Sequence, residues 1–218
     1  MVWLETFFTA SEWIGIVAFA ASGAMIAIDR ELDLFGVLFL GITSAVGGGI
    51  VRDLILGITP PGAFRNPGYL AVSAAVSLAV FLFAWLWHRQ YSKRHMAMDH
   101  IINLLDAIGL GLFGPMGVEA VIAQGYGENL FLCVFIGMTT GVGGGMLRDI
   151  FSNTVPAVLH KRVYAVAVIL GSLIYALLRR TSLPSSIAVA IAMLVTVVIR
   201  VLSSVFRWNL PRVNMEKN

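Results

Sequence analysis

Long apolar runs separated by short polar stretches make up most of this chain. Seven of the runs are long enough, or nearly so, to cross the roughly 30 Å hydrocarbon layer of a membrane as helices. They cover residues 9–28, 34–56, 68–87, 101–123, 129–151, 163–178 and 185–206. The pattern therefore predicts an all-α integral membrane protein with seven transmembrane helices, forming a single membrane domain over 1–206 that is followed by a tail at 207–218.

Composition agrees with this class. Of the 218 residues, 58% are hydrophobic and only 12% are charged, whereas soluble domains are about one quarter charged. The formal charge of +3 comes from basic loops, so we expect no nucleic-acid partner. The single cysteine, Cys133, excludes an intramolecular disulfide and a Cys-based metal site, and we expect no metal and no cofactor. No Lys or Arg precedes Arg30, so we expect the first helix to be retained rather than cleaved as a signal peptide.

The basic residues of the loops predict how the chain is oriented. Nine Lys and Arg residues fall after the first, third and fifth helices and in the tail, namely Arg30, Arg89, Lys93, Arg94, Lys161, Arg162, Arg207, Arg212 and Lys217. The other side holds three, which are Arg65, Arg179 and Arg180. The positive-inside rule then predicts a multi-pass protein of the cell membrane (the inner or plasma membrane) with its N-terminus outside and its C-terminus in the cytoplasm.

The chain also repeats itself at a nearly constant interval. Matching residues are separated by 94 to 96 positions, as in Phe19 and Phe113, Gly47 and Gly143, and Tyr69 and Tyr164. The first three helices (about 9–87) thus match the next three (about 101–178), and the helix at 185–206 stands alone. Because three crossings are an odd number, the second unit enters the membrane upside down. This predicts an inverted 3+3 repeat plus a seventh helix, with a shared site near the midplane where helices are discontinuous.

One motif occurs in both halves, as Gly47-Gly48-Gly49-Ile50-Val51-Arg52-Asp53 and as Gly143-Gly144-Gly145-Met146-Leu147-Arg148-Asp149. Each glycine inside a helix costs on the order of 1 kcal/mol relative to alanine, and unpaired charges in an apolar run cost more. We therefore expect each helix to break at its glycines.

Residues four apart share one face of a helix. One such stripe carries Ser44, Gly48 and Arg52, and Thr140, Gly144 and Arg148 repeat it. A second stripe has spacing suited to close helix packing, and it consists of Gly41, Ala45, Gly49 and Asp53, repeated as Gly137, Gly141, Gly145 and Asp149. One stripe is predicted to line a path and the other to pack a helix. The candidate pore or substrate-binding residues are Gly47, Gly48, Gly49, Gly143, Gly144, Gly145, Thr43, Ser44, Thr139 and Thr140. In the alternative, the glycines serve close packing only.

Charged residues in the same helices are candidates for gating or ion pairing. They are Arg52, Asp53, Arg148, Asp149, Glu12 and Asp106. Glu12 and Asp106 occupy matching positions in the two halves of the repeat. Helix lengths place Glu12 level with Arg52 and Asp106 level with Arg148. We predict one ion pair at each mouth of a central path, acting as a gate or as a rigid staple. Two other charges receive no role: Glu119 is expected to be solvated at the interface, and Arg200 to extend to the cytoplasmic surface.

The doubled Gly-Gly-Gly-x-x-Arg-Asp motif in the second and fifth of seven helices resembles the TRIC family of trimeric intracellular cation channels, over nearly the whole chain to about Phe206. The resemblance implies a homotrimer with one pore per protomer, passing between the second and fifth helices and conducting monovalent cations, chiefly potassium. The helices would be kinked at the triple glycines, each followed by the family's Arg-Asp pair. The lysine of the animal Lys-Glu-Val segment is missing at Gly117-Val118-Glu119-Ala120.

Three functions remain open from the sequence. Hydroxyls and glycine carbonyls suit a potassium channel, although arginines on the lining stripe repel cations unless acids neutralise them. Some bacterial relatives are linked to glycine uptake, and half-helix ends at the midplane suit a glycine carrier working by alternating access. The third function is a membrane scaffold. An enzyme is not expected, because the apolar runs hold no nucleophile–base set and no phosphate loop between a strand and a helix.

Overall fold

The computed structural model describes residues 2–87, 95–160, 163–206 and 208, and within these ranges the chain forms nine helices and no strand. Six helices are long and apolar enough to span a membrane. They are α1 (Val2–Asp29), α2 (Leu34–Ile55), α4 (Pro67–Leu86), α6 (His95–Ala123), α7 (Leu130–Phe151) and α10 (Ser185–Val205). The predicted seventh run forms α9 (Tyr164–Leu178), an apolar helix of only 15 residues. An all-helical, multi-span membrane protein is confirmed, while seven crossings stay a prediction.

Two short helices were not expected from the sequence. They are α3 (Gly62–Arg65), which follows α2, and α8 (Ala157–His160), which follows α7. The sequence pattern treats both places as ordinary connections, because four residues are too few for a hydrophobic period to appear. The predicted tail at 207–218, except residue 208, and the basic residues at 89, 93 and 94 lie outside the described residues.

Polar residues begin three of the membrane helices. The side chain of Asp33 accepts a hydrogen bond from the Gly36 amide at 2.8 Å, which caps α2. Asn129 caps α7 in the same way, by accepting from the Leu132 amide at 3.0 Å. Asn66 caps α4, whose first residue is Pro67. These caps satisfy amides that a helix start leaves without partners.

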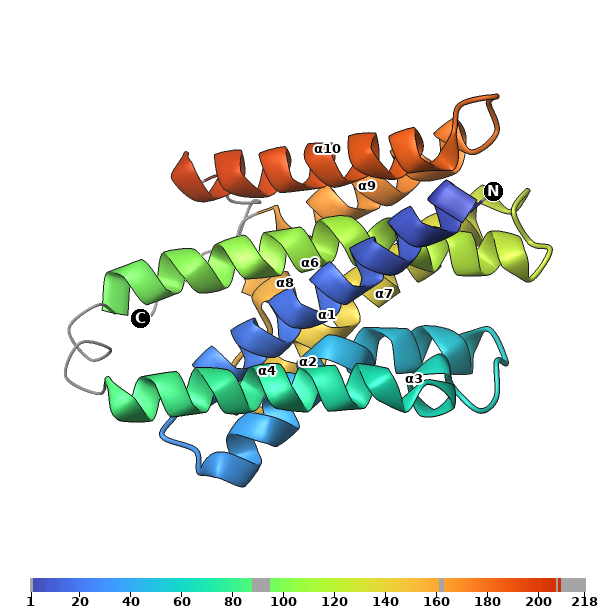
Figure 1. Ribbon diagram of the computed structural model, residues 1–218. Helices are drawn as coiled ribbons and strands as arrows, with labels where there is room; N and C mark the ends of the chain where they lie inside the picture. The colour runs from blue at the N-terminus through green and yellow to red at the C-terminus, as the bar shows by residue number, and fades with distance from the viewer. Residues whose placement is uncertain (1, 88–94, 161–162, 207, 209–218) are drawn as a thin grey trace, which may run out of the picture.

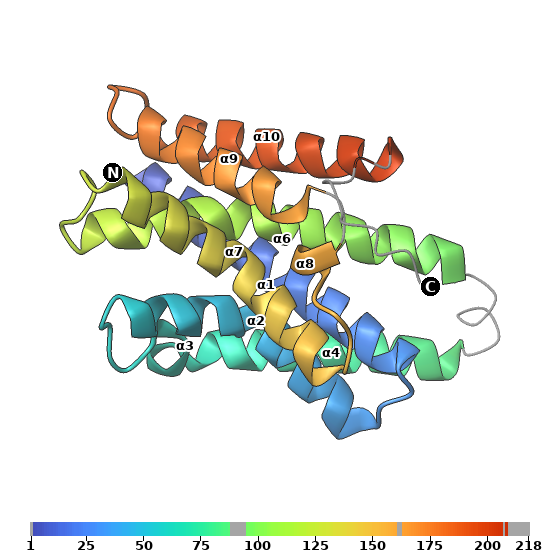
Figure 2. The same cartoon turned by 180° about the vertical axis from the view of Figure 1, so that it is seen from behind.

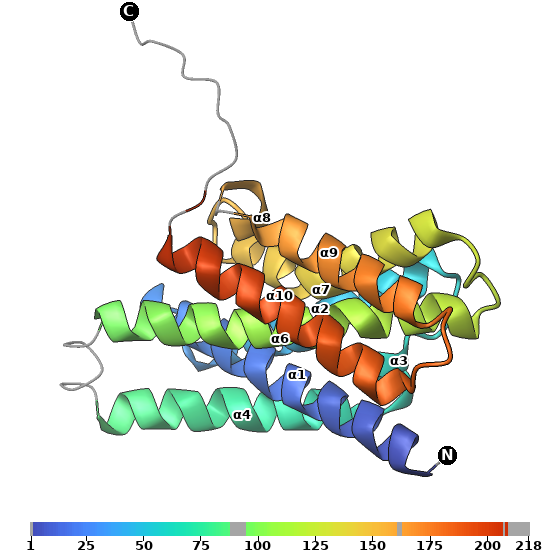
Figure 3. The same ribbon diagram turned by 90° about the horizontal axis from the view of Figure 1, so that it is seen from above.

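The helices form a bundle in which α1, α2, α6 and α7 lie centrally. Here α1 packs on α6 and α2 packs on α7. Figures 1 and 3 show α4 on one side of these helices and α9 with α10 on the other. The view from behind shows α2 and α7 running in opposing directions across each other (Figure 2). Each half of the chain has the same order of elements, since α1, α2, α3 and α4 are followed by α6, α7, α8 and α9.

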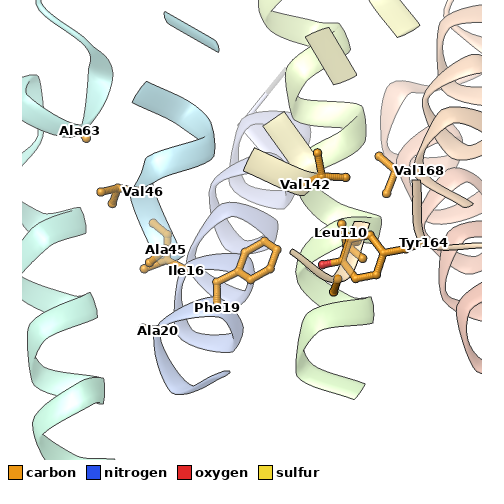
Figure 4. Close-up of a cluster of buried hydrophobic side chains, with 11 residues drawn as sticks. Ile16, Phe19, Ala20, Ala45, Val46, Ala63, Leu110, Val142, Tyr164 and Val168 are labelled. Atoms are coloured by element: carbon orange, nitrogen blue, oxygen red, sulfur yellow. The ribbon is translucent and has the colours of Figure 1, made fainter. Parts of the chain in front are cut away.

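Buried apolar side chains gather at the centre of this bundle (Figure 4). The central cluster, as we call it, comprises Ile16, Phe19, Ala20, Ala45, Val46, Ala63, Leu110, Val142, Ala157, Tyr164 and Val168. The ring of Phe19 stacks on that of Phe113 with 5.4 Å between centroids. Because the two phenylalanines occupy matching positions in the two halves, equivalent elements meet at this point.

The prediction that the helices break at their glycines is wrong. Both α2 and α7 continue through the triple glycine to Ile55 and Phe151. A Cβ atom on Gly48 would overlap the carbonyl oxygen of Thr140, and one on Gly144 would overlap that of Ser44. Close backbone contact between the crossing helices therefore offsets the low helix propensity of glycine, as small residues do in membrane helix pairs.

Candidate functional site

The six charged residues selected from the sequence line two separate cavities, three in each. The first, which we call the Arg52 cavity, has a volume of about 190 Å³ and is lined by Glu12, Arg52 and Asp53. Gly49, Asn66, Tyr69, Phe113 and Thr140 also line it. The second, the Arg148 cavity, has about 470 Å³ and is lined by Asp106, Arg148 and Asp149 with Asp29, Arg30 and Tyr164.

The central cluster lies between the two cavities. Ile16, Ala45 and Val46 belong both to the cluster and to the wall of the Arg52 cavity. Tyr164 and Ala157 belong both to the cluster and to the wall of the Arg148 cavity. Figure 4 shows the ring of Phe19 directed towards Leu110 and the Tyr164 ring. In this conformation, apolar side chains therefore separate the two polar spaces.

In the Arg52 cavity the charges are only partly paired. Arg52 donates from Nε to Asp53 Oδ1 at 2.8 Å, and its side chain is 19% exposed. Glu12 accepts a hydrogen bond from the Tyr69 hydroxyl at 2.6 Å. The predicted Glu12–Arg52 ion pair is absent from the described contacts, because the neighbouring Asp53 takes the guanidinium instead. Both residues nevertheless lie on the wall of the same cavity.

In the Arg148 cavity the charges form a closed network. Arg148 donates from Nη1 to Asp106 at 3.0 Å and to Ser22 at 2.8 Å, and from Nε to Asp149 at 3.0 Å. The Arg148 side chain is only 3% exposed. The predicted Asp106–Arg148 ion pair is thus present, and the structure adds Ser22 of α1 and Asp149 to it. Buried charges require this degree of pairing.

The aspartate of each motif also holds the short helix that follows. Asp53 Oδ2 accepts a hydrogen bond from the Gly62 amide, at the start of α3, at 2.7 Å. Asp149 Oδ2 accepts from the Ala157 amide, at the start of α8, at 2.7 Å. Each carboxylate therefore binds an arginine with one oxygen and a backbone amide with the other. This fixes the arginine relative to the chain segment that closes the cavity.

Two tyrosines complete these networks, and sequence reasoning did not select them. Tyr69 donates a hydrogen bond to Glu12, and Tyr164 donates one to Asp106. The repeat already pairs these two tyrosines in the sequence, so a signal was available. In the sequence, however, a tyrosine in an apolar run is indistinguishable from one that packs at the membrane interface. Only the fold shows that each hydroxyl binds a carboxylate.

The ten predicted lining residues lie mainly at the crossing of α2 and α7. Gly49 and Thr140 line the Arg52 cavity, although the Thr140 hydroxyl donates to the Ile136 carbonyl at 2.6 Å. Thr139 likewise donates to its own helix, at Phe135. Gly47, Gly48, Gly143, Gly144 and Ser44 are buried, Thr43 is half-buried, and Gly145 lies beside Tyr164 and Arg148.

The first predicted stripe, at Gly48 and Gly144, therefore contains the glycines of the helix crossing. Of the second stripe, Gly41 packs against Ser77 and Gly137 against Ser172, while Gly49 faces a cavity. The division into one lining and one packing stripe does not hold, because each stripe meets different neighbours along its length.

Two charged residues that received no role bind other side chains of the bundle; the side chain of Glu119 is 33% exposed, whereas Arg200 is buried. Glu119 accepts from both Nε and Nη2 of Arg179 at 3.1 Å and from the Tyr175 hydroxyl at 2.8 Å. These hydrogen bonds raise the pKa of Arg179. Arg200 is buried at 5% exposure, with its guanidinium carbon 4.3 Å from the centroid of the Tyr164 ring. The expectation that Arg200 reaches the membrane surface is wrong, because an aromatic ring inside the bundle binds it.

Comparisons with known proteins agree with this architecture. A family model described as Glycine transporter matches residues 9–85 and again residues 103–180. The UPF0126 membrane protein YvgT of Bacillus subtilis is 37% identical over 198 residues, which cover 91% of this chain and 92% of that protein.

Solved structures of similar fold are TRIC channels. A TRIC cation channel superposes with a TM-score of 0.83 at 36% identity, covering 97% of this chain and 99% of that one. The TRIC orthologue of Rhodobacter sphaeroides gives 0.82 at 29% identity, covering 93% of this chain and 99% of that one. The resemblance to the TRIC family is therefore confirmed.

Proposed function

The chain belongs to the glycine transporter family, and we propose that it is a membrane channel for monovalent cations, chiefly potassium. The permeation path would run from the Arg52 cavity past the crossing of α2 and α7 to the Arg148 cavity. The central cluster would close that path in the conformation described. The structural likeness to TRIC cation channels at 29–36% identity supports this assignment. Because these comparisons concern transport proteins, they also favour a transport protein over an enzyme.

The observation that carries the proposal is the charge balance of the Arg52 cavity. The Arg52 cavity has two carboxylates, Glu12 and Asp53, and a single guanidinium. The described residues on the wall of the Arg148 cavity include three carboxylates and two guanidiniums, and Arg200 packs against Tyr164 of that wall as a further cation. Arginines on a permeation path oppose cations, but Asp53 neutralises Arg52, and Glu12 leaves one further negative charge in the Arg52 cavity. Acidic residues at this position attract cations to a pore.

The proposal includes the assembly and the orientation that the sequence predicts. We place the N-terminus and the Arg52 cavity outside, and the Arg148 cavity towards the cytoplasm, on the basis of the loop charges. An inverted repeat is supported by the family model, which matches each half of the chain separately. A homotrimer with one pore per protomer is proposed from the likeness to trimeric TRIC structures.

Glycine transport is the second candidate, and the Arg52 cavity favours it. At about 190 Å³ the cavity is large enough for a small zwitterion, and it has a guanidinium and a carboxylate on its wall. Arg52 would bind the substrate carboxylate and Glu12 its ammonium group. Because one cavity is tightly paired and the other only partly, the arrangement also suits a carrier with one side closed. The uninterrupted α2 and α7 weigh against this candidate, since carrier sites are usually built from broken helices.

Purified protein in liposomes distinguishes the two candidates. We would measure potassium flux and radiolabelled glycine uptake in the same preparation, with and without a membrane potential. A channel gives potassium flux that does not saturate and no glycine signal. Saturable glycine uptake with counterflow would replace the channel by the carrier, and the absence of both signals would favour a scaffold.

A charge-neutralising variant tests the charge balance directly. Glu12→Gln removes the extra negative charge from the Arg52 cavity and should lower potassium flux several-fold, by about 3- to 10-fold. Glu128→Gln is the matched control, because Glu128 is 98% exposed and lies outside both cavities. Equal flux from the two variants would exclude the Arg52 cavity from the path.

A further inference from the structure

Four charged side chains are buried together beside the Arg148 cavity. Asp106, Arg148, Asp149 and Arg200 are each no more than 6% exposed. Two carboxylates and two guanidiniums make this set electrically neutral. Without Arg200, the remaining three residues would leave a buried negative charge, which is costly inside a membrane protein.

Arg200 reaches this set through an aromatic ring. Its guanidinium carbon lies 4.3 Å from the centroid of the Tyr164 ring, and the Tyr164 hydroxyl donates to Asp106. Asp106 in turn accepts from Arg148. Contacts thus lead from α10 through α9 and α6 to α7. The Nε of Arg200 has no hydrogen-bond partner among the described residues, so its burial is compensated mainly by charge and by the ring.

Among the described residues, no cation packs on the equivalent tyrosine in the other half of the chain. Tyr69, which corresponds to Tyr164, has the indole ring of Trp13 at its edge, with 5.1 Å between centroids. The Arg52 network is also the more exposed of the two. Because α10 lies outside the repeat, it supplies a contact that only one of the two networks receives.

From this difference we infer that Arg200 is a positioning residue for the proposed permeation path, holding the Arg148 network closed by neutralising it and by fixing the Tyr164 ring. This inference rests on the proposed function in one respect, namely that a path passes the Arg148 network. Loss of Arg200 should leave an unbalanced carboxylate, draw water or a cation into the network, and raise the population of its open form.

Cysteine accessibility tests the inference independently of what is transported. The only native cysteine, Cys133, is replaced by serine, and Val142→Cys places a reporter in the central cluster (Figure 4). A charged, membrane-impermeant thiol reagent is applied to proteoliposomes. Arg200→Met, which keeps the volume of the side chain without its charge, should raise the modification rate about tenfold, which corresponds to about 1.4 kcal/mol of population shift. Arg180→Met, a cation outside both cavities, should leave the rate unchanged.

Two further variants keep the inference open to refutation. Arg200→Lys retains the charge and should restore slow modification in large part. Tyr164→Phe removes the hydroxyl that links Arg200 to Asp106 and should raise the rate about threefold, because the ring remains. An unchanged rate in correctly folded Arg200→Met would overturn the inference. If that variant does not fold, an unchanged rate in Tyr164→Phe has the same force. Absence of both potassium and glycine flux in the unmodified protein would instead contradict the proposed function.

Discussion

Arg52 and Arg148 occupy the same position of a repeated motif, yet their surroundings differ. Arg148 binds Asp106, Asp149 and Ser22 and is almost fully buried. Arg52 binds Asp53 alone among the described residues, and its side chain is 19% exposed. The two motifs have the same Arg-Asp pair, and each half supplies a tyrosine and an acid. Nearly equivalent sequences therefore give one closed network and one that opens into a cavity.

The difference arises from what packs behind each motif. In the Arg148 network, Ser22 of α1 accepts a hydrogen bond from Arg148, and Arg200 packs on the Tyr164 ring. Arg200 belongs to α10, the helix outside the repeat. Behind the Arg52 network, Trp13 packs against Tyr69 and Glu12 remains apart from Arg52. An internal repeat thus supplies two similar sites, and residues that the two halves do not share decide how firmly each one is closed.

Removing one acid from each network should separate them most clearly. Asp106→Asn leaves the buried Arg148 short of a carboxylate and should lower the free energy of unfolding by about 3 kcal/mol. Glu12→Gln keeps an acceptor for Tyr69 in a more open site and should cost less than about 1 kcal/mol. Thermal or denaturant unfolding in one detergent measures both. Equal losses would contradict the distinction between the two networks.

The helix crossing should respond alike in both halves. Gly48→Ala and Gly144→Ala each direct a methyl group into a backbone carbonyl of the facing helix, so each should cost about 2 kcal/mol. Gly49→Ala is the matched control, because its Cβ would meet only an Arg52 nitrogen at 3.7 Å. That change should be neutral or stabilising by up to about 1 kcal/mol. Unfolding midpoints and the elution volume on a sizing column would report the effects, and a neutral Gly48→Ala would refute tight packing here.

Replacing each arginine by lysine tests how many contacts of each guanidinium contribute to stability. Arg148 donates from Nε and Nη1 and contacts Asp149 with Nη2, a geometry that an ammonium group cannot reproduce. Arg148→Lys should therefore cost about 1.5 kcal/mol of stability. Arg52→Lys should cost about 0.5 kcal/mol, because its one ion pair is partly exposed. The same unfolding assay applies, and a larger loss at Arg52 would reverse the comparison.

The smallest effects are expected at the two tyrosines. Tyr164→Phe deprives buried Asp106 of a donor and should cost about 1 kcal/mol, whereas Tyr69→Phe should cost about 0.5 kcal/mol because Glu12 is half-buried. A double-mutant cycle of Tyr164→Phe with Asp106→Asn should give a coupling energy close to the effect of Tyr164→Phe alone, about 1 kcal/mol. Additive behaviour would mean that the two side chains do not interact.

Much of the architecture could be predicted from the sequence, because a membrane imposes simple rules on a chain. The length of each apolar run locates a helix, and all six long helices were predicted. Most of their predicted ends lie within a few residues of the observed ends. The start of α1 at Val2 and of α6 at His95 was missed, because Glu5 and Thr6 interrupt the apolar pattern in α1, and Asp99 and His100 interrupt it in α6. The spacing of repeated residues also selected six of the eight described charges that line the two cavities, and Asp29 and Arg30 were missed.

What the sequence by itself determined is therefore the helices, the repeat and the candidate charges, all of which depend on spacing along one chain. Only the tertiary structure decided which partner each charge takes. Arg52 binds the adjacent Asp53 rather than Glu12, and Asp53 and Asp149 hold the starts of α3 and α8. Ser22, Tyr164 and Arg200 come from three other helices. The physical reason is that a helical period gives the face of a residue, whereas pairing depends on distances of about 3 Å between helices that the period does not specify.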